Sequence, residues 1–183
     1  MKSYENKYFS ILGDSISTLL GYNPEENAVF YNAINGRTAN IFAPEDCWWG
    51  QVIDALGGRL LVNEAFSGST VCPLPGGEIE SHASSDKRTS NLARGGVSPD
   101  VILIMMGTND CGMHFSLDDF IPSSRLMLEK IKRNYPSAEI CCITPLSESE
   151  YCDAVRALAR EQECLLADLE AHQRAFALIF TLA

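Results

Sequence analysis

Five short apolar runs, separated by helical patterns, set the framework of the chain. A run of this length that is bounded by turn residues predicts a buried β-strand. Val101–Met106, which reads VILIMM, is apolar at every position, as expected for a central strand that is covered on both faces. The five predicted strands are Tyr8–Leu12, Leu60–Ala65, Val101–Met106, Glu139–Ile143 and Leu165–Leu169.

Apolar positions at helical spacing lie between these runs. Asp46 is expected to cap a helix that ends at Gly57-Gly58. The apolar stripe of this helix consists of Trp48, Trp49, Val52, Ile53 and Leu56. Further helices are predicted near Lys87–Leu92, from Leu117 to Asn134 and around Tyr151–Leu158, with long loops at Gly21–Pro44 and over most of Cys72–Gly96. The alternation predicts one α/β domain over residues 1–183 with helices on both faces of a parallel sheet, but it does not give the strand order.

Composition and charge narrow the possible partners. The 183 residues carry a net charge of −10 without a basic stripe, so neither nucleic acid nor an anionic membrane is expected as a partner. The seven cysteines are scattered and contain no CxxC pair, which argues against a disulfide scaffold or a zinc site. No leader pattern precedes the first strand and no apolar run approaches membrane-spanning length, so we expect a cytoplasmic protein.

The first predicted strand runs directly into Gly13-Asp14-Ser15-Ile16-Ser17. A serine at a strand-to-helix turn can hold its hydroxyl clear of the sheet, and the free N–H groups of a helix start can face an anion. Asp14 and Ser17 could equally be capping residues. On spacing alone that second interpretation is favoured, because an isolated short motif is most often an ordinary turn.

Two further loops carry suitable groups at the ends of predicted strands. Gly107-Thr108-Asn109-Asp110 follows VILIMM, and Asn109 can present its side-chain amide there, although Asn-Asp is also a common turn former. Ser67-Gly68-Ser69 follows Leu60–Ala65 and can offer a backbone N–H. Ligand sites of open α/β sheets lie at this edge. Three such loops together are stronger evidence for a site than any one of them.

With these three blocks in order, the chain resembles the SGNH (GDSL-type) hydrolases over nearly its whole length. The resemblance implies a flavodoxin-like three-layer α/β/α sandwich and hydrolysis of a small ester by a serine nucleophile, without a cofactor. It implies that Ser15 attacks the carbonyl while the Ser15 N–H, the Gly68 N–H and the Asn109 amide hold the oxyanion. The remaining loop residues expected at the substrate pocket are Asp14, Thr108, Asp110 and His114.

The fourth block of that family, Asp-x-x-His, is absent from this chain. It would supply the base and the carboxylate that orients it. His82 is expected to be a solvated loop residue, and His114 to line the pocket rim. His172 follows Asp168 with three intervening residues instead of two, so this pair is a candidate base and orienter, with a surface role favoured for His172.

The C-terminal residues offer an explanation for the missing block. The codons of Ala177–Leu182, read two nucleotides later, can spell Pro-Asp-Leu-His-Pro. We therefore hypothesise a frameshift that altered the catalytic loop and the last helix, which the coding DNA would test. The apolar tail Phe176–Phe180 would then pack over the sheet or mediate a homo-oligomer, and catalysis would be impaired.

Two functions remain open on the sequence. The first is a serine esterase for small or carbohydrate-linked acyl groups, and the second is a non-catalytic protein that holds a carboxylate or acyl ligand in the same pocket. A nucleotide-binding role is disfavoured because the chain has neither GxGxxG nor a P-loop. Arg37 and Arg88 are candidates for substrate contacts, with a solvated role favoured for each, and Trp48 and Trp49 are expected to pack in the core.

Overall fold

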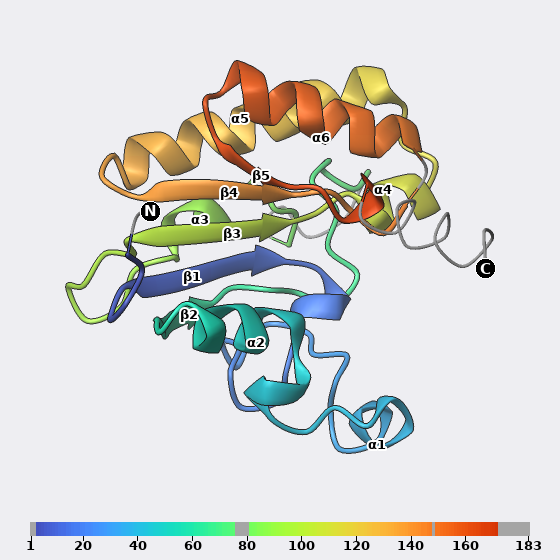
Figure 1. Cartoon of the computed structure of the whole chain (residues 1–183). Coiled ribbons are helices and arrows are strands. Elements are labelled where there is room, and N and C mark those ends of the chain that lie inside the picture. Colours follow the sequence, from blue (N-terminus) through green and yellow to red (C-terminus); the bar gives the residue numbers. More distant parts are fainter. Residues whose placement is uncertain (1–2, 76–80, 148, 172–183) are drawn as a thin grey trace, which may run out of the picture.

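The computed structural model describes residues 3–75, 81–147 and 149–171, and within them a five-stranded parallel sheet forms the centre of the molecule (Figure 1). The strand order is β2-β1-β3-β4-β5, which is the order of flavodoxin-like folds and confirms the expected fold class. The strands are β1 (Tyr8–Gly13), β2 (Arg59–Asn63), β3 (Val101–Met105), β4 (Glu139–Ile143) and β5 (Leu165–Ala167).

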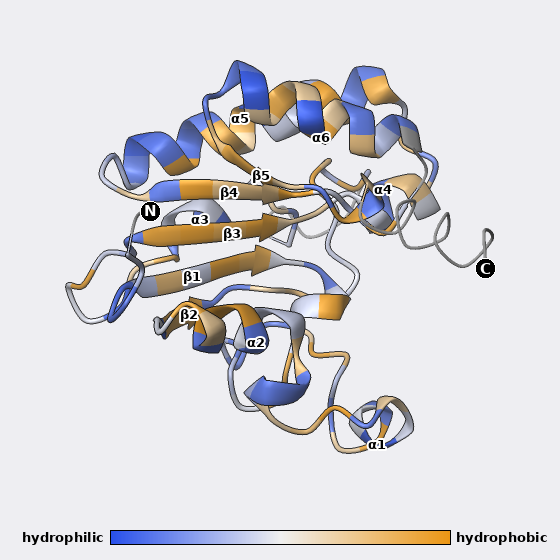
Figure 2. Cartoon of the chain, viewed as in Figure 1, coloured by the Kyte–Doolittle hydropathy of each residue, from blue (hydrophilic) through white to orange (hydrophobic). Residues whose placement is uncertain are grey.

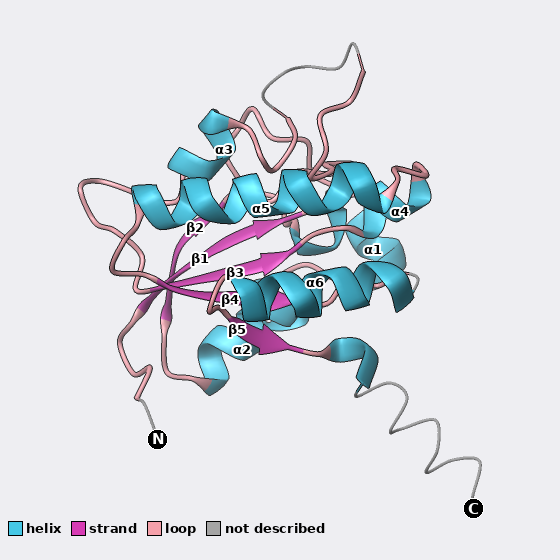
Figure 3. Cartoon of the chain, turned by 90° about the horizontal axis from the view of Figure 1, so that it is seen from above, coloured by secondary structure: helices cyan, strands magenta, loops and turns pink. Residues whose placement is uncertain are grey.

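Helices cover both faces of this sheet and complete three layers. One face carries α3 (Asp86–Ser90), α5 (Leu117–Asn134) and α6 (Ser149–Glu161), and the other carries α2 (Trp48–Ala55), as the view from above shows (Figure 3). The short elements η1 (Ser15–Ser17) and α4 (Thr108–Gly112) follow β1 and β3 at the arrowhead end of the sheet (Figures 1 and 3). Two more, α1 (Asn35–Ala39) and η2 (Pro44–Asp46), lie within and at the end of the predicted long loop.

The residues of β3 are hydrophobic along the whole strand (Figure 2), and two buried clusters lie on the two sides of the sheet. In β3 every side chain is buried, and alternate residues serve opposite faces. Ile102 and Ile104 pack toward α5 and α6, whereas Val101 and Leu103 pack toward α2. The prediction that this strand is central and covered on both sides is therefore confirmed. None of the helices within the described part of the chain is long and apolar enough to cross a membrane.

The predicted N-cap of α2 was wrong by one residue. Asp46 ends η2, where its carboxylate accepts hydrogen bonds from the N–H groups of Phe42 and Ala43 at 2.9 and 3.0 Å, and Cys47 occupies the N-cap of α2. The expected stripe is also only partly buried, because Trp49 and Ile53 are buried in the core while Val52 and Leu56 are exposed. Trp49, at 1% exposure, is a core residue as expected.

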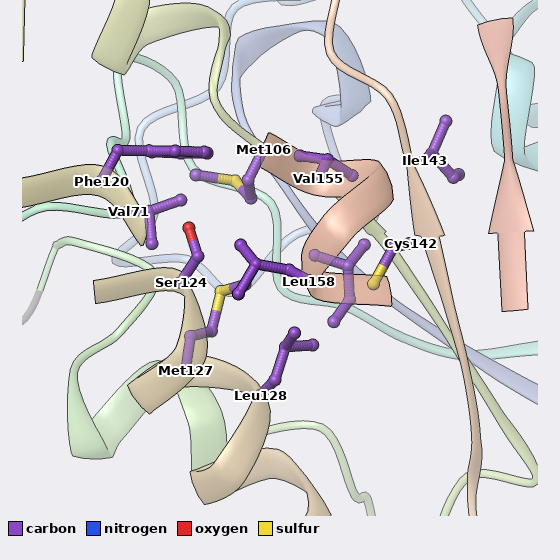
Figure 4. Close-up of a pocket in the computed structure, with 11 residues that line it drawn as sticks. Val71, Met106, Phe120, Ser124, Met127, Leu128, Cys142, Ile143, Val155 and Leu158 are labelled. Carbon is purple, nitrogen blue, oxygen red and sulfur yellow. The ribbon is translucent and has the colours of Figure 1, made fainter. Parts of the chain in front are cut away.

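A small internal cavity of about 20 Å³ lies between the sheet, α5 and α6 (Figure 4). Its walls are apolar except for the buried Ser124 hydroxyl, which has no hydrogen-bond partner among the described residues. A cavity of this size holds at most one water molecule. It is a packing gap of the core, so candidate chemistry has to be sought at the arrowhead end of the sheet.

Candidate active site

Ser15 opens η1 immediately after the carboxyl end of β1. The preceding Asp14 is the N-cap, and its carboxylate accepts a hydrogen bond from the Ile16 N–H at 3.1 Å, which supports the capping alternative. The Ser15 side chain is half-buried, and neither its hydroxyl nor its backbone N–H bonds to another group among the described residues. Both groups are therefore available to a ligand at this edge.

Hydrogen bonds to Ser17 hold the turn that carries Ser15 in place. The Ser17 carbonyl accepts hydrogen bonds from Trp49 Nε1 at 3.0 Å and Asn63 Nδ2 at 2.8 Å, and its hydroxyl accepts one from Trp48 Nε1 at 3.1 Å. Gly13 leaves room for this arrangement, because a Cβ at that position would lie 2.5 Å from Ser17 Oγ. The turn is thus fixed by groups from α2 and β2.

The loop after β2 lies against the end of β1 and carries Gly68. The Phe66 N–H donates to the Gly13 carbonyl at 3.0 Å, which extends the strand pairing into the loop. Gly68 has a φ of +80°, a conformation that glycine adopts without strain. Its N–H has no acceptor within the described residues, so this loop also offers a free backbone donor.

Asn109 brings the loop after β3 to the same place. Its side-chain Nδ2 donates to the carbonyl of Ser69 at 2.8 Å, directly beside Gly68. An amide nitrogen carries two hydrogens, so this bond fixes the orientation of the amide and leaves one donor for a ligand. The three predicted loops are therefore tied to one another by direct hydrogen bonds.

Asp110 is completely buried below these loops. Its carboxylate accepts hydrogen bonds from the N–H of Val71, at 3.0 and 2.9 Å to its two oxygens, and from the N–H of Cys72 at 3.0 Å. Burial raises the pKa of Asp110, and the two backbone N–H groups oppose that rise. The geometry gives this residue a structural task in holding the segment that follows Ser69.

Burial also raises the pKa of Asp14, from its ordinary value of 3.8 to about 6. The hydrogen bond from the Ile16 N–H and the nearby Thr108 side chain lower the pKa, and the nearby Asp110 carboxylate raises it further. With 1% of its surface exposed, Asp14 is a buried acid directly beside Ser15.

Because of this raised pKa, Asp14 makes stability depend on pH. The folded protein holds its proton up to about pH 6, whereas the unfolded chain loses it near pH 4, so the free energy of unfolding falls as pH rises between these values. Asp14→Asn keeps an oxygen for Ile16 and lacks this titration. Urea unfolding at pH 4 and pH 7 should therefore show the variant gaining up to about 3 kcal/mol relative to the wild type. Equal pH dependence in the two proteins would contradict the assignment.

Neither histidine within the described residues hydrogen-bonds to Ser15. His114 is exposed at the end of α4, and His82 is half-buried with its Nδ1 2.8 Å from Ser84 Oγ. The exposure of His82 is thus lower than expected for a solvated residue. His172, the altered catalytic loop and the apolar tail Phe176–Phe180 lie outside the described residues, so those expectations remain predictions.

Asp168 follows β5 directly, because the strand ends at Ala167, two residues before its predicted end at Leu169, and Asp168 is bound by Arg156. Two of the guanidinium nitrogens, Nε and Nη2, donate to the two carboxylate oxygens at 2.8 and 2.7 Å, and Nη2 also donates to Glu170 at 2.7 Å. Such a two-point contact holds the carboxylate in one orientation. If Asp168 orients a base, it does so from within this ion-pair cluster.

The predicted exposure of Arg88 differs most clearly from the structure. The solvated role favoured for it is wrong, because its side chain is 1% exposed and its guanidinium lies among the three loops. Arg88 lies on the buried face of the short helix α3, which Ser85 caps. The sequence carries no local signal for this burial, because acceptors of Arg88 such as the Gly13 and Glu64 carbonyls come from distant segments. Arg37, in contrast, is exposed.

An open cleft of about 630 Å³ lies beside the loop that follows β3. It runs between α4, the segment Pro145–Ser147 and Glu170, and Thr108 forms part of its wall next to Asn109. The cleft is large enough for a small acyl or sugar group. Over the described ranges, no cluster of three or more histidine, cysteine or acidic side chains could hold a metal ion.

A known protein family and several solved structures are similar to this chain over most of its length. The family model for GDSL-like Lipase/Acylhydrolase proteins matches residues 7–174. Among solved structures, a presumed GDSL-like lipase from Bacteroides ovatus shares 28% identity with a TM-score of 0.74, covering 90% of this chain and 86% of that one. A second, from Bacteroides uniformis, shares 29% identity with a TM-score of 0.73, covering 88% and 82%.

A third solved structure, of lower sequence identity, is similar to this chain in fold only. It is a family two carbohydrate esterase from Clostridium thermocellum in complex with cellohexaose, with 20% identity and a TM-score of 0.56, covering 92% of this chain and 55% of that one. A search among curated proteins found no match.

Proposed function

Since the chain belongs to the GDSL-like lipase/acylhydrolase family, we propose that it is a serine hydrolase that cleaves a small or carbohydrate-linked ester. The observation that carries the proposal is the arrangement of free donors around Ser15. The N–H groups of Ser15 and Gly68 have no acceptor among the described residues, and Asn109 has one amide hydrogen left. Such a set is suited to an oxyanion.

In this mechanism the Ser15 hydroxyl oxygen adds to the ester carbonyl and loses its proton to a base. The negative charge that develops on the carbonyl oxygen is held by the three donors of Ser15, Gly68 and Asn109. Collapse of this intermediate breaks the ester bond and releases the alcohol, which takes up a proton. Water then attacks the acyl group on Ser15, releases the acid and restores the serine. The cleft at Thr108 would receive part of the substrate.

The base remains a prediction. His172, oriented by Asp168, is the proposed candidate, and His114 lies exposed at the rim. We further propose that residues 1–183 act as one domain in the cytoplasm, in keeping with a family match over residues 7–174 and seven free thiols. A small-molecule ester is the proposed partner, with neither nucleic acid nor a membrane surface, given the net charge of −10.

A non-catalytic role is the second candidate, and one observation favours it. Neither described histidine bonds to Ser15, so the donors could hold a carboxylate or acyl ligand without turnover. Binding of acetate, measured by calorimetry, in a protein that hydrolyses no ester would support this alternative.

The experiment that tests the first candidate combines turnover with labelling. The full chain should hydrolyse p-nitrophenyl acetate, and a fluorophosphonate should form a covalent adduct on Ser15 that mass spectrometry locates in the peptide containing Gly13–Ser17. Hydrolysis without an adduct on Ser15 would exclude it as the nucleophile. Absence of both hydrolysis and adduct would exclude the hydrolase and leave the binding role.

Asn109 provides a test of the oxyanion donors. Replacing Asn109→Ala removes one donor, and we expect kcat for p-nitrophenyl acetate to fall about a hundred-fold or more. Asn109→Asp is the matched variant, because it keeps the shape of the side chain and replaces the donor with an acceptor. It should lose at least as much activity. Full activity in Asn109→Asp would show that the amide hydrogen is not used.

A further inference from the structure

The guanidinium of Arg88 is buried in the middle of the candidate site, although no chemical step uses it. Its Nη2 donates to the Gly13 carbonyl at 3.1 Å and to the Glu64 carbonyl at 2.6 Å. Its Nη1 donates to the Ser81 carbonyl at 2.8 Å and to the Ser69 hydroxyl. All four hydrogens of the two terminal nitrogens are therefore engaged.

Two of these contacts lie close in sequence to the proposed backbone donors, one at the Gly13 carbonyl and one at the Ser69 hydroxyl. Gly13 lies two residues before Ser15, and Ser69 follows Gly68 directly. Ser69 is also the residue whose carbonyl accepts the Asn109 amide. One rigid planar group thus links the first loop to the second, and through Ser69 it reaches the third.

The charge of Arg88 is balanced by a second buried side chain. The Glu64 carboxylate lies 3.8 Å from Arg88 Nε and accepts hydrogen bonds from Asn27 at 3.4 Å and Asn91 at 2.8 Å. Burial lowers the pKa of Arg88 to about 10, with Glu64 and Asp14 opposing, so the group is charged at neutral pH. A cavity of about 90 Å³ borders Arg88, Glu64 and Phe66, and leaves room beside the guanidinium.

A buried ion pair of this kind contributes little net stability, because the desolvation of both charges offsets their attraction. A well-packed apolar side chain would fill the same volume at lower cost. What a guanidinium adds is a fixed fork of donors that determines where several carbonyl groups lie. These contacts indicate that Arg88 serves to position the backbone of the loops that it contacts.

We propose that Arg88 is a positioning residue of this active site, which fixes the Gly13 carbonyl and the Ser69 turn and thereby sets the spacing between the Ser15 and Gly68 N–H groups. The inference rests on the proposed hydrolase function for its kinetic test. Small displacements of oxyanion donors change transition-state binding more than substrate binding, so kcat should respond more than KM.

The test compares Arg88→Met and Arg88→Lys with Arg125→Met as the control, in which an exposed arginine paired with Glu161 is lost from α5. At a temperature where circular dichroism shows all proteins folded, kcat for p-nitrophenyl acetate should fall about ten- to a hundred-fold in Arg88→Met. KM should change less than about three-fold, and Arg88→Lys should recover part of the loss because one cationic donor remains. The Arg125→Met control should retain full activity.

Ser69→Ala provides a smaller change, in case both Arg88 variants fail to fold. It removes one partner of Arg88 and should lower kcat several-fold without affecting KM. Wild-type kcat in folded Arg88→Met, or in Ser69→Ala where the arginine variants do not fold, would overturn the proposal.

An amide NMR experiment separates this inference from the proposed function. If the wild type hydrolyses no ester, the hydrolase proposal fails, and the backbone N–H resonances of Ser15 and Gly68 still report on Arg88. They should shift in the folded Arg88 variants, or in Ser69→Ala, and stay in place in Arg125→Met. Unmoved resonances in the folded variants of Arg88 or Ser69 would overturn the positioning role independently of catalysis.

Discussion

Replacing Ser15→Ala is expected to reduce kcat for p-nitrophenyl acetate by about 10⁴- to 10⁶-fold, the range in which loss of a serine nucleophile leaves only the oxyanion donors and binding. The fold should be unaffected, because the hydroxyl makes no hydrogen bond within the described part of the chain. The thermal midpoint of the variant should therefore equal that of the wild type. The same substitution should abolish the fluorophosphonate adduct.

Ser90→Ala is the matched control for this measurement. Ser90 lies exposed at the end of α3, and its hydroxyl donates only to the Lys87 carbonyl at 3.1 Å. The control should keep both turnover and adduct formation. Hydrolysis that survives in Ser15→Ala at the wild-type rate would remove Ser15 from the mechanism, whatever the state of the base.

The largest expected effect on stability belongs to Asp110. Asp110→Ala leaves the buried N–H groups of Val71 and Cys72 without their acceptor, and a buried donor that loses a charged partner costs about 1.5–3 kcal/mol. We therefore expect the free energy of unfolding at pH 7, measured in urea, to fall by about 3–5 kcal/mol. The loss should exceed that of any exposed acidic residue.

Two further variants serve as comparisons for the unfolding measurement on Asp110→Ala. Asp110→Asn retains one oxygen that can accept from Val71 or Cys72, so it should lose about half as much stability. Asp54→Ala removes an exposed carboxylate from α2 and should leave the unfolding midpoint unchanged. An Asp110→Ala protein as stable as the Asp54→Ala control would show that water satisfies the two N–H groups.

The parts of the fold that the sequence predicted are those set by local apolar patterns. β3 was located within one residue because every side chain of Val101–Met105 is buried. The strand order could not be predicted in the same way, since it depends on which strands meet in space. The N-cap of α2 was misplaced by one residue for a local reason, because the Asp46 carboxylate accepts hydrogen bonds from the preceding N–H groups of Phe42 and Ala43.

In the candidate site, too, the residues marked by local motifs were predicted, and a residue defined by tertiary contacts was not. Ser15, Gly68 and Asn109 were identified from short motifs at strand ends, and hydrogen bonds now tie their loops together. The burial of Arg88 was missed because arginine is normally exposed, and only the tertiary structure supplies the four acceptors that make this burial possible. Partners that come from distant segments leave no local pattern to detect.

The anchoring of Ser17 also gives the protein an intrinsic optical probe. The chain contains only two tryptophans, Trp48 and Trp49, and both indole N–H groups donate to Ser17, two residues after Ser15. Tryptophan emission responds to the hydrogen bonding and polarity around the indole. Fluorescence of the unlabelled protein should therefore follow ligand binding or displacement at this turn directly, without a dye or an added reporter group.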